Sequence, residues 1–162
     1  MKTARRFQGG FTLIEVLIVV VIMAVLAATI IPQFAGSTRE AKTSALQFNQ
    51  QTMRSQIELY KENHLGAYPA ITNSDLPQMW QATNAAGTVG AAGTNFPFGP
   101  YINNALPTNP FNSSASVVAV ATAGTVPTAA IGTTAGWQYD ATTGGIYPNN
   151  VEYYGGGNQS AY

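Results

Sequence analysis

The most pronounced pattern along the chain is an almost unbroken apolar run from Phe11 to Ile31, preceded by a glycine pair and followed by Pro32. A helix rises about 1.5 Å per residue, so this run reaches roughly the thickness of the hydrocarbon core of a bilayer. A helix also satisfies its own backbone hydrogen bonds in lipid. The sequence therefore predicts a membrane-spanning helix over residues 11–32, and the one charged residue inside it is Glu15.

The residues before the apolar run predict its orientation. Lys2, Arg5 and Arg6 precede it, and no acidic residue does. The positive-inside rule then places the N-terminus in the cytoplasm and the rest of the chain across the membrane. An ordinary secretory signal has an apolar region of only about 7–15 residues, so secretion as a freely soluble protein is disfavoured.

Pro32 is expected to disturb the helix locally, because proline removes one hydrogen bond and clashes with the carbonyl four residues back. We predict a kink or local loosening between Ala24 and Pro32. Residues 33–64 then continue as a soluble amphipathic helix, which Gly66 and Pro69 end. The spacing of the apolar residues predicts one buried face. Its members are Phe34, Ala41, Ala45, Phe48, Met53, Ile57 and Tyr60.

Residues 65–162 are rich in turns and predict a small head. We expect a short helix over 75–80, capped by Ser74 or Asp75, and a loop over 82–94. The segments 137–140 and 145–148 flank a glycine-containing turn and predict a β-hairpin. Residues 112–136 are either a weak hairpin or an insertion, and the tail from Glu152 is expected to be loosely ordered.

Together these elements predict an α+β fold. A long N-terminal hydrophobic helix would pack by its C-terminal half on a small head with an antiparallel sheet. The expected division of the chain is a leader at 1–10, the membrane helix at 11–32, its soluble half at 33–64 and the head at 65–162.

Composition and charge exclude several classes of function. The formal net charge is zero, but no Lys or Arg occurs from Asn63 onward, which argues against nucleic-acid binding. The chain has no cysteine, one histidine and none of the common catalytic motifs, so we do not expect an enzyme.

The N-terminal motif adds a family resemblance. The residues Gly10-Phe11-Thr12-Leu13-Ile14-Glu15, with a basic leader before them and Pro32 after the apolar run, resemble the class III signal of type IV pilins and type II secretion pseudopilins. The resemblance implies that prepilin peptidase cuts between Gly10 and Phe11, and that the new Phe11 amine is N-methylated. It also implies a filament subunit that waits in the bacterial inner membrane with its head in the periplasm.

The cut exposes an α-amine on Phe11, which Glu15 of an adjacent copy can face in a helical stack. Such a carboxylate–ammonium pair would set the register of subunits, because a copy out of step leaves a buried charge unpaired. Pro32 marks either a region that stretches on filament entry or a fixed bend. The partners implied are further copies of the chain, minor pilins or pseudopilins, prepilin peptidase, an inner-membrane platform and a motor ATPase.

Within the family, the missing disulfide, the small head and the junction from His64 to Pro69 favour a major pseudopilin of type II secretion. The alternatives are the major subunit of a type IV pilus and a membrane-anchored binding module. Major pseudopilins often carry calcium in a C-terminal loop, for which Asp140 and Glu152 are weak candidate ligands here. We expect no other cofactor.

Overall fold

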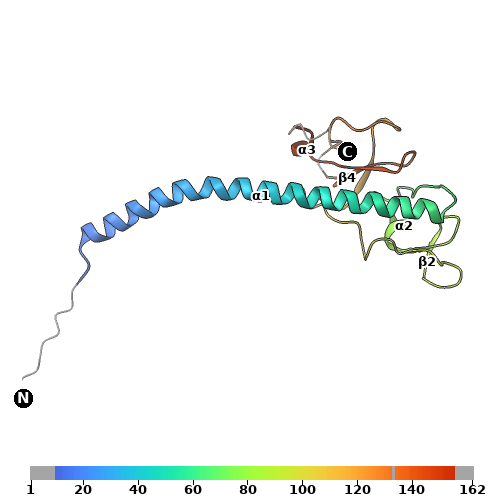
Figure 1. Ribbon diagram of the computed structural model, residues 1–162, viewed down its shortest axis with the longest axis horizontal. Helices are drawn as coiled ribbons and strands as arrows, with labels where there is room; N and C mark the ends of the chain where they lie inside the picture. Colours follow the sequence, from blue (N-terminus) through green and yellow to red (C-terminus); the bar gives the residue numbers. More distant parts are fainter. Residues whose placement is uncertain (1–9, 133, 156–162) are drawn as a thin grey trace, which may run out of the picture. The chain divides into compact units, whose positions relative to one another are not determined.

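The computed structural model describes residues 10–132 and 134–155. The chain forms two units, residues 1–41 and 42–162. Helix α1 (Leu13–Asn63, 51 residues) contributes to both units (Figure 1). By length and composition α1 can cross a membrane, and every residue from Gly10 to Ile31 is exposed. The fold is α+β, as the sequence predicts, with the long apolar helix followed by small sheets.

The helix is continuous through Pro32. Shortly before the proline, the Thr29 hydroxyl donates to the carbonyl oxygens of Val25 (3.1 Å) and Leu26 (2.9 Å). The side chains of residues 32–35 lie outside the described part of the chain, and so does the predicted burial of Phe34. The predicted kink or loosening is therefore not a break in α1, and a local loosening there stays a prediction.

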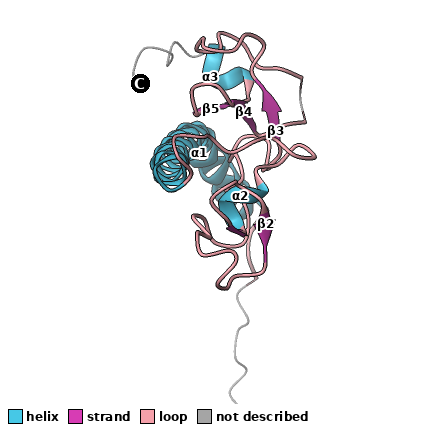
Figure 2. Ribbon diagram, turned by 90° about the vertical axis from the view of Figure 1, so that its right-hand side faces the viewer, coloured by secondary structure: helices cyan, strands magenta, loops and turns pink. Residues whose placement is uncertain are grey.

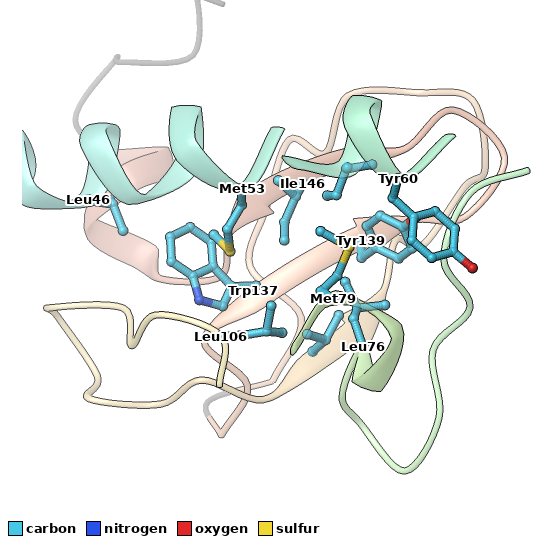
Figure 3. Close-up of a cluster of buried hydrophobic side chains, with 11 residues drawn as sticks. Leu46, Met53, Tyr60, Leu76, Met79, Leu106, Trp137, Tyr139 and Ile146 are labelled. Atoms are coloured by element: carbon cyan, nitrogen blue, oxygen red, sulfur yellow. The ribbon is translucent and has the colours of Figure 1, made fainter. Parts of the chain in front are cut away.

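The core of the head lies between α1 and the strands that follow it (Figure 3). The helix contributes Leu46, Met53, Ile57 and Tyr60, each at most 2% exposed. The buried apolar residues that they pack with are Leu76, Met79, Leu106, Val117, Trp137, Tyr139 and Ile146. A buried hydrogen bond also links the helix to the sheet, since Gln50 Nε2 donates to the backbone oxygen of Ile146 at 2.9 Å.

The buried face of α1 is rotated from the predicted one. Phe48 is 69% exposed, and Ala41 and Ala45 are exposed as well. Leu46 and Gln50 lie on the buried face with Met53, Ile57 and Tyr60, and His64, directly after the helix, is buried as well. The prediction is confirmed for Met53, Ile57 and Tyr60 and wrong for the described residues before them. It fails there because Gln50 and His64 are polar and interrupt the apolar pattern, whereas in the fold both find hydrogen-bond partners.

The predicted hairpin is confirmed. Strands β4 (Trp137–Asp140) and β5 (Gly145–Pro148) pair antiparallel through a four-residue turn, with Asp140 opposite Gly145. Gly144 in this turn has φ +73°, and a Cβ there would overlap the ring of Tyr68. Glycine is therefore required both by the backbone angle and by the close packing.

The sheet around this hairpin is mixed and not purely antiparallel. Strand β3 (Val117–Ala119) pairs in parallel with β4, so the order is β3-β4-β5 (Figure 2). Residues 112–136 are therefore not a hairpin of their own. Their first part supplies β3, and residues 120–136 form the connection to β4 that a parallel pair requires.

Three local predictions in the head need correction. Helix α2 (Pro77–Trp80) begins later than expected and has no side-chain cap from Ser74 or Asp75, because its N-cap position is occupied by Leu76, whose side chain has no hydrogen-bond acceptor. The expected loop 82–94 contains the antiparallel strands β1 (Ala82–Thr83) and β2 (Val89–Gly90). The expected loose tail begins with helix α3 (Val151–Gly155), and residues 156–162 lie outside the description.

Polar and charged side chains also fasten α1 to the head. His64 stacks on Tyr60 at 3.7 Å between ring centroids, and its Nε2 lies 3.0 Å from the hydroxyl of Thr83 on β1. Three of the helix cations lie over aromatic rings of the head, which is a favourable electrostatic arrangement. These pairs are Lys42 over Phe111 (5.8 Å), Arg54 over Tyr147 (5.3 Å) and Lys61 over Tyr68 (4.8 Å).

The end of α1 yields a stability prediction. Leu65 has φ +57° and is 95% exposed, and Gly66 follows with φ +86°. A left-handed conformation costs a non-glycine residue about 1–2 kcal/mol, which glycine avoids. Glycine in turn loses about 0.5–1 kcal/mol more conformational entropy on folding, which offsets part of this gain. Leu65→Gly should therefore raise the free energy of unfolding by about 0.5–1 kcal/mol.

The measurement is thermal unfolding of the full chain in detergent micelles. Ala67→Gly is the matched control, because Ala67 is also exposed but is not among the residues with positive φ. The control should lower the unfolding midpoint. If Leu65→Gly lowered it as well, Leu65 would not be strained.

Candidate functional site at the start of helix α1

The first turn of α1 is organised by a reciprocal pair of residues, Thr12 and Glu15. The backbone N–H of Thr12 donates to Glu15 Oε2 at 2.8 Å, and the Thr12 hydroxyl donates to the same oxygen at 2.7 Å. In return, the backbone N–H of Glu15 donates to the Thr12 hydroxyl oxygen at 3.3 Å. This is a capping box, which satisfies backbone donors that the first helical turn leaves without a partner.

Glu15 is the only acidic residue in the exposed apolar part of the helix. Its position near the helix start places a negative charge at the positive end of the helix dipole. Both hydrogen bonds from Thr12 end on Oε2. Among the described residues, Oε1 accepts none. A shallow hollow beside the carboxylate is lined by Phe11, Glu15, Val16, Val19 and Val20.

The predicted cleavage site lies just outside the helix. Gly10 and Phe11 precede Leu13, where α1 begins, and Phe11 is 89% exposed. Apart from its chain neighbours, no described residue has an atom within 4 Å of the position that a Cβ on Gly10 would occupy. The peptide bond between Gly10 and Phe11 thus lies outside the helix and is not covered by the described residues, which favours proteolysis.

Sequence reasoning missed Thr12 as a member of this site. The signal was present, because Thr12 and Glu15 match the pattern of a serine or threonine followed three residues later by an acidic residue at the start of an apolar helix. Pro32, the other predicted assembly residue, is not brought to this site. It lies 17 residues beyond Glu15 in the same helix, or about 25 Å along the axis.

The candidate calcium ligand Asp140 lies at the end of β4 and is 2% exposed. Its Oδ1 accepts from the backbone N–H and the hydroxyl of Thr142, at 2.9 and 2.6 Å. Its Oδ2 accepts from the backbone N–H of Gly124 at 2.6 Å and from the Thr143 hydroxyl at 2.9 Å. The four acceptor positions of an ionised carboxylate are therefore all used inside the protein.

Glu152, the second candidate, lies on α3, is exposed and accepts from Asn150 Nδ2 at 3.3 Å. Calcium takes six to eight oxygen ligands, usually with several carboxylates. Among the described residues, no group of three or more His, Cys, Asp or Glu side chains is positioned to hold a metal ion. Since Asp140 is also committed to four internal hydrogen bonds, these residues do not fit a calcium site.

Comparison with known proteins agrees with the geometry at the start of α1. Residues 5–31 match the family model described as the prokaryotic N-terminal methylation motif. This match contains Gly10, Phe11, Thr12 and Glu15, and it ends at Ile31. No solved structure matches the chain.

Several curated proteins extend the similarity into the head, and each is a type II secretion system core protein G. The protein of Klebsiella pneumoniae is 30% identical over 106 residues, which cover 65% of this chain and 71% of that protein. The protein of Vibrio cholerae is 28% identical over 132 residues, covering 82% and 84%. The protein of Pseudomonas aeruginosa is 38% identical over 66 residues, covering 41% of this chain and less than half, 46%, of that protein. With the capped apolar helix at its start, the chain belongs to the family of type II secretion system core protein G, the major pseudopilins.

Proposed function

We propose that the chain is a structural subunit of a type II secretion pseudopilus, assembled through its apolar helix after prepilin peptidase has removed residues 1–10. The observation that carries the proposal is the exposed apolar part of α1 with its single acid at the start. Family membership supports this function over that of a type IV pilus subunit or of an isolated binding module. The role is structural and requires no catalytic residue.

The exposed side chains of α1 explain why the subunit would be stored in a membrane and then assembled. From Gly10 to Ile31 every residue is exposed in the part of the chain that the structure describes. Lipid covers such a surface while the subunit waits, and other copies of the helix would cover it in a filament. Outside lipid, burial contributes about 25 cal/mol per Å² of apolar surface, so separation of the helices would be strongly unfavourable.

Glu15 would select the correct register between copies. Thr12 holds Oε2, and Oε1 is left for the α-amine that cleavage creates on Phe11 of an adjacent copy. In a low-dielectric filament core, each charge alone would be costly, and the pair offsets that cost. A subunit out of step would bury both charges without partners, so the pair discriminates between registers more than it adds stability.

Pro32 would contribute to assembly through the backbone. Proline has no N–H, so one hydrogen bond of the preceding turn is missing. The turn before Pro32 can therefore extend at lower cost when the subunit enters a filament. The same proposal places the N-terminus in the cytoplasm and the head in the periplasm. Its partners are further copies, minor pseudopilins, prepilin peptidase, an inner-membrane platform and a motor ATPase.

Processing gives a direct prediction. The mature protein should lack residues 1–10 and carry one methyl group on the Phe11 amine. The check is the intact mass of the protein purified from membranes of cells that contain a prepilin peptidase. Gly10→Val should keep the leader attached, because a branched side chain then stands at the cleaved bond. A functional protein that retains its first ten residues would contradict the proposal.

The register role of Glu15 gives a second prediction. Glu15→Gln keeps the size of the side chain but removes its charge, so processing should continue while filaments become at least tenfold fewer, corresponding to about 1.4 kcal/mol or more per subunit. The measurement is the fraction of processed protein in sheared filaments.

Glu152→Gln is the matched control for loss of one negative charge, because Glu152 is exposed on the head. It should assemble like the unchanged protein. Equal filament yield from Glu15→Gln would show that the carboxylate has no role in register.

A further inference from the structure

The connection between β3 and β4 has little apolar anchoring of its own. Residues 121–126 are all exposed, and they belong to a stretch composed mainly of Ala, Ser, Thr, Val and Gly. Such a segment buries too little apolar surface to offset the entropy lost on ordering. Something other than its own packing must therefore hold residues 120–136 against the sheet.

One attachment is made by Asp140. Its Oδ2 accepts the backbone N–H of Gly124 at 2.6 Å, which joins the middle of the connection to the end of β4. Burial by itself would raise the pKa of Asp140, but the hydrogen bonds from Thr142, Gly124 and Thr143 lower it to about 2. The carboxylate is thus ionised at neutral pH, and hydrogen bonds to an ionised group are roughly twice as strong as neutral ones.

A second attachment is made by Asn149, which is 1% exposed. Its Oδ1 accepts from the backbone N–H of Ile131 at 2.6 Å, and its Nδ2 donates to the backbone oxygen of Ile131 at 2.8 Å. The same Nδ2 donates to the backbone oxygen of Ala135 at 3.0 Å. One amide therefore supplies both partners of Ile131, as a neighbouring strand would.

A third attachment is made by Gln138, which is fully buried on β4. Its Nε2 donates to the backbone oxygen of Ala129 at 2.8 Å and to the Tyr154 hydroxyl at 3.0 Å. Its Oε1 is buried without a hydrogen-bond partner among the described residues. A single neutral oxygen falls far short of the six to eight ligands that calcium takes.

We propose that Asp140, Asn149 and Gln138 form a protein-only latch that holds residues 120–136 on the sheet, so that the head folds without calcium. The three side chains engage the connection at Gly124, Ala129, Ile131 and Ala135, and thus along most of its length. The Asp140 carboxylate is engaged by the Gly124 N–H, Thr142 and Thr143, which leaves no free acceptor position for an ion. The proposal does not depend on filament assembly.

The test is thermal unfolding of the full mature chain in detergent micelles, once with excess EGTA and once with excess calcium chloride. The unchanged protein should have the same midpoint in both solutions. Asp140→Asn should lower the midpoint by about 5 °C in both, because an amide cannot accept four hydrogen bonds. Glu152→Gln, which alters the other candidate ligand, should change neither midpoint.

Amide hydrogen exchange locates the effect and remains informative if Asp140→Asn folds poorly. Thr143→Val is the milder variant, since it keeps the Asp140 carboxylate and removes two bonds of the Thr143 hydroxyl, the one to Oδ2 and the longer one from the Gly145 N–H (3.3 Å). Thr125→Val is its control in the same connection, because Thr125 donates to the Thr122 carbonyl oxygen. The Gly124 amide should exchange slowly with either additive in the unchanged protein and at least tenfold faster in Thr143→Val, but not in Thr125→Val. The proposal would be overturned if calcium raised the unfolding midpoint of the unchanged protein or slowed exchange of its Gly124 amide. The same holds if Asp140→Asn or Glu152→Gln abolished that effect of calcium.

Discussion

The head depends on contact with one face of α1. Its strands contain only two to four residues each, and the chain has no cysteine with which to join them. Sheets this small are marginal in water unless they pack against another element. Met53, Ile57 and Tyr60 of the helix provide that surface, and Trp137, Tyr139 and Ile146 pack on it. Residues 42–63 of the helix are therefore part of the folded domain and not a tether to it.

The first half of the same helix, in contrast, belongs to the other of the chain's two units, residues 1–41. Its apolar side chains are uncovered, and the one carboxylate among them is held by Thr12 instead of by a cation. That arrangement lowers the cost of a charge beside lipid and keeps one oxygen available. This arrangement suits the proposed transfer from lipid to a filament, because an acid fully neutralised within its own chain would have no reason to select a partner on a neighbouring copy.

The sequence was informative where a pattern is local. The hairpin of β4 and β5, the end of α1 and the motif around Phe11 all follow from adjacent residues. Prediction failed where distant residues decide the outcome. Nothing local in the sequence indicates that Gln50 and His64 are buried, because their partners, Ile146 and Thr83, are distant along the chain. Strands of two residues, such as β1, are too short to show alternation, and the parallel pairing of β3 joins segments that no turn connects. The hydrogen bonds of Asp140 could not be predicted either, because one of them comes from the backbone of Gly124, 16 residues earlier in the chain.

The turn between β4 and β5 has a practical consequence for handling the protein. Gly144 lies so close to the ring of Tyr68 that a single added carbon would overlap it. Hairpin tips are commonly chosen for epitope tags or cysteine labels, but this tip is unsuitable because an insertion would disrupt its packing against Tyr68. Gly93 is the better position for a reporter, since nothing lies within 4 Å of an added Cβ there and its surroundings are exposed.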